Sequence, residues 1–148
     1  MTKPTTKAPI NLRIFAIAAT GTMPIRDAAG VPQFAEDGET PLTITMHSPG
    51  SRVYQRAKHA ADQRNNERVM ARMQGKAADK QSAEEKAAER AELLAACTIS
   101  INGADLDGET GHDAFKKLYS DPELGHIADD ADKFLGDRGN FKKVSSPS

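Results

Sequence analysis

The sequence predicts an α+β fold in which a small antiparallel sheet is combined with a long helical segment and C-terminal helices. Three observations predict it. Short stretches of alternating apolar and polar residues lie in the first third of the chain. A helical pattern rich in alanine and charge follows over residues 52–96. A short β-like stretch then precedes the cleanest amphipathic pattern of the chain, close to its end.

The N-terminal third is expected to supply two or three strands. Apolar residues alternate with polar ones from Ile10 and become continuous up to Ala19, which predicts a strand that ends at Gly21. A short strand around Ile25 is restricted to a sheet edge or a loop by the prolines beside it. Residues 42–46 alternate again and predict a further strand. Since no helix-length crossover separates these strands, we expect them to be antiparallel.

Residues 52–96 are predicted to form a helical hairpin or arm that is hinged near residues 74–81. Ser51 is the expected N-cap of the first helix. Ser82 and Glu85 match a capping box that begins the second. The first helix is expected to bury Val53, Ala57, Ala60 and Ala61, and the second a stripe of Ala83, Ala87, Ala91, Leu94 and Ala95.

The last third returns to the sheet and ends in helices. Residues 98–101 are β-like, and their natural partner is the N-terminal sheet. A short helix is predicted over residues 113–119, and Pro122 suits the first turn of another. The predicted apolar stripe of this last helix consists of Leu124, Ile127, Ala131, Phe134 and Leu135.

Length and composition limit the domain organisation. With 148 residues, the chain fits a single domain at residues 10–141 between flexible tails at residues 1–9 and 142–148. The chain has 23 alanines and no tryptophan, which excludes a large aromatic core. No apolar run reaches the roughly 18 residues that a membrane span needs. The single cysteine, Cys97, excludes an internal disulfide, suits a reducing cytosol, and is expected to be packed rather than reactive.

Motifs for chemistry are absent from the sequence. It contains no phosphate-binding glycine loop, no nucleophile elbow and no histidine or cysteine cluster with zinc spacing. Residues 103–108 are similar to a calcium loop, but the first and twelfth ligand positions fall on Gly103 and Ala114, which offer no side-chain oxygen. We therefore expect no enzymatic activity, no cofactor and no metal.

Charge is distributed unevenly along the chain. Residues 52–76 carry seven basic and two acidic residues, about +5, whereas residues 104–137 carry ten acidic and three basic residues, about −7. One interpretation is that these segments are two solvated faces of one fold. The other is that their charge steers a partner or docks one segment on the other. Basic residues at every fourth position could follow a phosphate backbone, but the net charge of −1 and the lack of aromatic neighbours disfavour nucleic acid. This basic stripe consists of Arg64, Arg68, Arg72 and Lys76.

Several stretches together resemble the tail assembly chaperones of long-tailed bacteriophages and prophages. The resemblance covers roughly residues 36–141. It rests on PLTITMHSPGS at residues 41–51 before an Arg/Ala/Gln helix, LLAACT at residues 93–98, LYSDPELGHI at residues 118–127 and FLGDRGNF at residues 134–141.

The resemblance implies a non-enzymatic protein of the host bacterial cytoplasm that is absent from the mature virion. Such chaperones bind the tape measure protein and recruit tail tube subunits around it. The alternative is a structural virion protein, such as a tail tube, tail terminator or connector subunit. A small core is also compatible with a homo-oligomer. We expect the partner-facing residues to be Val69, Met70, Met73, Leu124, Ile127 and Phe134, the alternative being that they are simply core.

Overall fold

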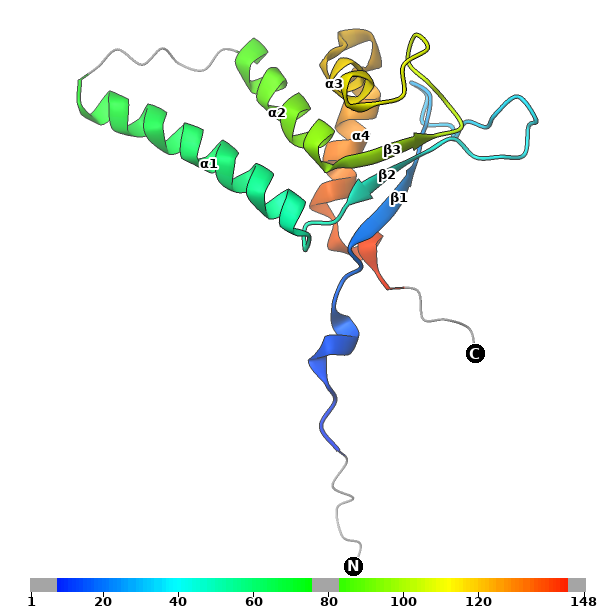
Figure 1. The fold of residues 1–148 in the computed structure, drawn as a ribbon, viewed down its shortest axis with the longest axis horizontal. Coiled ribbons are helices and arrows are strands. Elements are labelled where there is room, and N and C mark those ends of the chain that lie inside the picture. Colours follow the sequence, from blue (N-terminus) through cyan, green and yellow to red (C-terminus); the bar gives the residue numbers. More distant parts are fainter. Residues whose placement is uncertain (1–7, 76–82, 144–148) are drawn as a thin grey trace, which may run out of the picture.

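A computed structural model describes residues 8–75 and 83–143 of the chain, and it has the predicted α+β fold (Figure 1). A three-stranded sheet lies beside a set of α-helices. In chain order, the elements of the described residues are η1 (Leu12–Phe15), β1 (Thr20–Pro24), β2 (Thr43–His47), α1 (Arg52–Met73), α2 (Ala83–Cys97), β3 (Thr98–Asn102), α3 (His112–Ser120), η2 (Pro122–Leu124), α4 (Gly125–Gly136) and η3 (Arg138–Phe141).

The sheet has the order β1-β2-β3, and both pairs of neighbouring strands are antiparallel, as the sequence predicts. Met23 lies opposite Ile44, which lies opposite Ile101, so one face of the sheet is apolar. The other face is polar. Its residues include Thr22, Thr43, Thr45, Ser100 and Asn102, and the Asn102 amide donates to both Thr43 Oγ1 (3.0 Å) and Thr45 Oγ1 (2.9 Å).

The core lies between the apolar face of the sheet and helices α2, α3 and α4. Leu94 of α2 and Ala131 of α4 have no exposed surface, and Tyr119 of α3 is almost fully buried. The Oγ1 of Thr98 donates to the carbonyl of Leu94 (2.8 Å) and lies 2.7 Å from the Tyr119 hydroxyl. Because the Thr98 hydroxyl hydrogen is used in the bond to the Leu94 carbonyl, the Tyr119 hydroxyl donates its hydrogen to Thr98 Oγ1. The junction of α2 and β3 is therefore fixed by hydrogen bonds as well as by packing.

The prediction of a strand over residues 10–19 was wrong. Residues 12–15 form the 3-10 helix η1. The Asn11 side chain caps its first turn, because the Asn11 Oδ1 accepts a hydrogen bond from the Arg13 amide (3.0 Å). The strand is β1, which begins at Thr20 and contains Gly21, the residue expected to end it. An alternating pattern shows only that one face of a strand would be apolar; it supplies no partner strand.

Helix α1 begins as predicted but buries less than expected. The Ser51 hydroxyl accepts a hydrogen bond from the Tyr54 amide (3.1 Å), which confirms the N-cap. No residue of α1 is buried, and the predicted Val53 and Ala60 are exposed. The half-buried seam towards α2 consists of Tyr54, Ala57, Ala61, Arg68 and Ala71. On α2, Ala91, Leu94 and Ala95 are buried as predicted, whereas Ala83 and Ala87 are exposed.

Some predictions lie outside the described residues. These are the capping residue Ser82, most of the hinge at residues 74–81 and most of both tails. Within the described residues, Ile17 pairs with Lys142 in an isolated bridge, so the C-terminal segment meets the chain just before β1. The helices predicted over residues 113–119 and after Pro122 are confirmed as α3, η2 and α4.

Candidate protein-interaction surfaces

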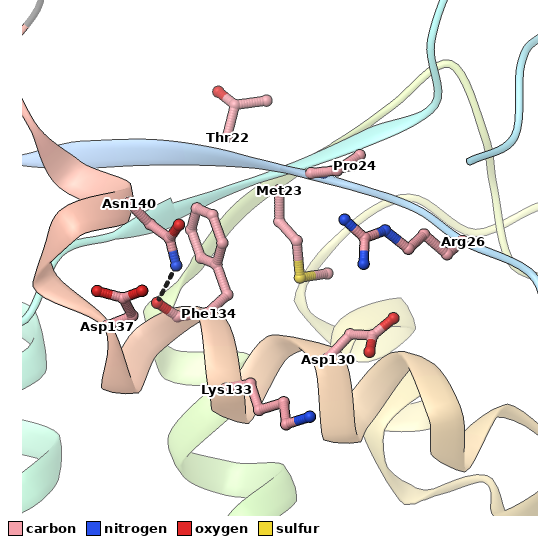
Figure 2. Close-up of a pocket in the computed structure, with 9 residues that line it drawn as sticks. All are labelled: Thr22, Met23, Pro24, Arg26, Asp130, Lys133, Phe134, Asp137 and Asn140. Carbon is pink, nitrogen blue, oxygen red and sulfur yellow. Dashed lines mark hydrogen bonds between the residues drawn. The ribbon is translucent and has the colours of Figure 1, made fainter. Parts of the chain in front are cut away.

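A groove of about 420 Å³ lies between β1 and α4 (Figure 2). Met23 points from the strand towards the helix. Phe134 comes from α4, on the other side of the groove, and its ring lies close to Met23. Phe134 also packs edge-on against Phe141 of η3, with ring centroids 5.0 Å apart. Apolar and polar side chains therefore share the lining, and Met23, at 3% exposed, contributes little of its accessible surface. The other lining residues are Thr22, Pro24, Arg26, Asp130, Lys133, Asp137 and Asn140.

The rim of this groove is polar and held in place by local hydrogen bonds. Asn140 donates to the carbonyl of Phe134 (3.1 Å), as Figure 2 shows, and Asp137 accepts from the Gly139 amide (2.9 Å). Arg26 and Asp130 face the groove from opposite sides. Two basic and two acidic side chains line the groove, so its charges balance.

The outer edge of β1 is open along part of this groove. The Ser48 amide donates to the Ala19 carbonyl (2.8 Å), and the Ile25 amide donates to the Leu42 carbonyl (2.9 Å). Odd-numbered residues of the strand therefore bond to β2, and the backbone of Thr22 faces the outer edge. Among the described residues, the C-terminal segment bonds to that edge just before β1, where the Ala18 amide donates to the carbonyl of Phe141.

A second candidate surface lies on the last turns of α1. Val69, Met70 and Met73 are 44%, 57% and 80% exposed, so these three residues are not core. Met70 borders an open depression of about 430 Å³ on the same helix, which is otherwise lined by Gln63, Asn66, Glu67, Ala71 and Gln74. Exposed methionines on a helix suit partners of irregular shape, because the side chain is flexible and polarizable.

The three predicted residues of the last helical segment are different. Ile127 is buried in the core, and Leu124 and Phe134 are half-buried against it. These side chains hold α4 to the rest of the fold, so for them the core interpretation fits the structure. Phe134 alone also borders an open groove.

The basic stripe of α1 faces acidic residues of α2. Arg64 lies 3.9 Å from Glu89 and 3.6 Å from Glu92, and Arg68 forms an ion pair with Glu89. The hydrogen bond to Glu89 raises the pKa of Arg68. Lys76 lies outside the described residues. Two of the four cations thus bind their own chain, which weakens the interpretation of the stripe as a phosphate-binding row.

Two ionisable side chains, Cys97 and Tyr119, are buried in the core. Cys97 has no exposed surface, and burial raises the pKa of its thiol to about 11. Burial likewise raises the pKa of Tyr119 to about 12. The described parts of the chain bring together no group of three or more His, Cys, Asp or Glu side chains suited to a metal ion. Among their helices, none has the length and apolar character to cross a bilayer.

The sequence reasoning missed the exposed N-terminal segment. It assigned Ile10, Leu12 and Ile14 to a half-buried strand, yet these residues and Phe15 are between 65% and 76% exposed. Nothing in the local pattern distinguishes an apolar face that packs inside its own fold from one that does not.

Comparisons with known proteins identified no similar protein. The chain matches no protein-family model, no curated protein and no solved structure.

Proposed function

We propose that this protein is a non-enzymatic tail assembly chaperone of a long-tailed bacteriophage or prophage, which binds the tape measure protein and recruits tail tube subunits. The proposal starts from the resemblance of residues 36–141 to that family. The observation that supports it best is the exposed apolar surface of Val69, Met70 and Met73 on α1. We place the protein in the host bacterial cytoplasm and expect it to be absent from the virion.

The physical argument concerns the partner. A tape measure is a long helical chain with much apolar surface, which aggregates when it is left bare. Helix α1 packs mainly on α2 and buries none of its own residues, so its outer face is available to another helix. Methionine adapts to many apolar surfaces, which suits a binder that meets different segments of one long partner.

The decisive experiment is co-expression with the tape measure protein of the phage or prophage that encodes this chain. The native chain should keep the tape measure in the soluble fraction and co-purify with it. The double variant M70D/M73D should lose both effects, because two carboxylates would be desolvated at the contact. V31D is the matched control, since Val31 is 53% exposed and lies in the loop after β1.

Both variants should keep the native circular dichroism spectrum and melting temperature. If M70D/M73D is folded and still solubilises the tape measure, α1 is not the binding surface. If the native chain never solubilises it, the chaperone proposal fails.

The alternative is a structural virion protein such as a tail tube, tail terminator or connector subunit. Mass spectrometry of purified virions separates the two roles. A chaperone leaves the particle during assembly, so its peptides should be missing, whereas a structural subunit is retained at a fixed ratio to the tail tube protein.

A further inference from the structure

Strand β1 lies at the edge of the sheet, and one side of its backbone is unpaired. Its odd-numbered residues bond to β2, so the backbone groups of Thr20, Thr22 and Pro24 face outward. Within residues 8–75 and 83–143, no backbone hydrogen bond joins these outward groups to another element. All three residues are exposed. An unpaired edge of this kind is a template for a further strand.

The open part of this edge has a defined length. Just before β1, the Ala18 amide is already bonded to the Phe141 carbonyl. At the other end, Pro24 is the last residue of the strand and has no amide hydrogen to donate. A strand that adds to this edge therefore has room only along Thr20–Pro24, which we call the β1 edge.

The β1 edge of a second copy fits this space in one antiparallel register. A two-fold axis at Thr22 places Thr22 opposite itself and Thr20 opposite Pro24. The two Thr22 residues then exchange both of their backbone hydrogen bonds. Each Thr20 amide donates to the Pro24 carbonyl of the other copy. In this register the added strand ends opposite Thr20, short of the position that the C-terminal segment occupies at Ala18.

Shifted registers lose bonds that this register keeps. A shift of two residues in one direction places the Pro24 carbonyl of the second copy opposite Ala18, whose amide is already bonded to Phe141. A shift in the other direction places Thr22 opposite Pro24, which accepts a hydrogen bond but cannot donate one. The donors and acceptors of the β1 edge are thus matched best by the same edge, which favours a second copy as its partner.

Side-chain charge does not oppose this contact. The groove between β1 and α4 runs along the same strand, and its two basic and two acidic side chains, Arg26, Lys133, Asp130 and Asp137, balance. Two such grooves that meet across a two-fold axis carry no excess of like charge. Thr22 points away from α4 in Figure 2, so the Thr22 pair would lie on the polar face of the sheet.

We propose that two copies of this protein pair along the β1 edge, with Thr22 on the two-fold axis, so that their sheets join into one continuous antiparallel sheet. The contact is distinct from the α1 surface of the proposed chaperone function and does not depend on it.

The first test places a charge on the axis. The native chain should dimerise in sedimentation velocity experiments over a hundredfold range of concentration. T22K and T22E should each weaken the dimer about three- to tenfold, because like charges would lie directly opposite each other. An equimolar mixture of the two variants should form a tighter dimer than either variant alone. The matched control is T20K, since Thr20 is exposed on the same strand but lies opposite Pro24 and should keep the native dissociation constant.

The circular dichroism spectrum of each variant should be native, because the side chain of Thr22 is exposed. A native chain that stays monomeric at every concentration overturns the proposal, and so does a native dimer that T22K and T22E both leave unchanged. A mixture of the variants that is no tighter than either one alone contradicts the position of the axis.

The second test maps the register by disulfide formation. T22C alone should give a cross-linked dimer under mild oxidation, because opposed residues have Cα atoms about 5.5 Å apart, within the range of a disulfide. T20C alone should give little product, since the two Thr20 residues would be about 13 Å apart along the paired strands. Mixing T20C with P24C should restore it. Cys97 has no exposed surface and does not compete. Equal yields from T22C and T20C would overturn the proposal.

Discussion

The ring of Phe141 occupies the space that a side chain on Gly21 would need. A Cβ on Gly21 would lie 2.6 Å from Cδ1 of that ring and 3.1 Å from the Asn140 carbonyl oxygen. Phe141 is itself 1% exposed and packs on Phe134 of α4. The 3-10 helix η3 near the C-terminus thus packs directly on the first strand, and its Asn140 lines the β1–α4 groove.

The variant G21A should therefore lose about 1–3 kcal/mol in free energy of unfolding, because a methyl group at this site overpacks the core. Urea denaturation measures the loss. In the double variant G21A/F141L, the smaller side chain should relieve part of the clash, so the two effects should not add. The control G125A lies in open space at helical angles and should be neutral or gain up to about 1 kcal/mol.

The variant I127A tests whether α4 is an internal element or a partner surface. Ile127 is buried in the core, so truncation should cost about 2–5 kcal/mol of unfolding free energy. V31A, at an exposed position, should change it by less than about 0.5 kcal/mol. An I127A protein with native stability would show that α4 is not packed as described.

The variant E89Q should loosen α1 selectively. Glu89 joins Arg64 and Arg68 to α2, and α1 has little buried surface to replace these contacts. Hydrogen exchange of the α1 amides should become about two- to fivefold faster, while the amides of α4 stay unchanged. The control E84Q changes an exposed glutamate in the first turn of the same helix. Because the pairs are partly exposed, raising the salt concentration should reproduce the effect in the native chain; an α1 insensitive to both changes would contradict this view.

Stability should fall at alkaline pH because two buried acids resist ionisation. Burial raises the pKa of Tyr119 from 10.0 to about 12 and that of Cys97 from 9.0 to about 11. Below pH 9 both groups keep their protons in either state. Above it the unfolded chain loses protons first, so stability declines as the pH rises through about 11 and 12.

Each group should contribute a loss of about 3 kcal/mol over this range. Thermal melts between pH 8 and pH 12 measure it. Y119F should make the decline between pH 10 and pH 12 shallower, because phenylalanine has no hydroxyl proton to lose. If Y119F and the native chain lose stability equally between pH 10 and pH 12, ionisation of Tyr119 is not a cause of the decline.

Local chemistry explains which elements could be predicted from the sequence. The hydroxyl of Ser51 needs only the amides that follow it to begin a helix, and Pro122 suits a first turn because the missing amide hydrogen has no partner there. The burial of Ile44 and Met46 follows from alternation within a single strand. These signals lie within a few residues of the feature that they predict.

Features that depend on distant residues could not be predicted. Thr20–Pro24 contains a glycine and a proline, which disfavour a strand, yet β2 on one side and Phe141 near it hold these residues in the sheet. In an alanine-rich helix several stripes are equally apolar, so the seam of α1 was placed partly on Val53 and Ala60 rather than on Tyr54. The β1–α4 groove joins residues more than a hundred positions apart, and no local pattern indicates it.

The last turn of α1 and the segment that precedes β1 lie on different sides of the molecule (Figure 1). The exposed methionines near the end of α1 are thus separated from the exposed apolar residues before β1 by the folded elements of one chain. On a long helical partner, two such surfaces gain avidity only where successive binding stretches recur at the same spacing. The spacing between the two surfaces would then determine where along its partner the protein binds.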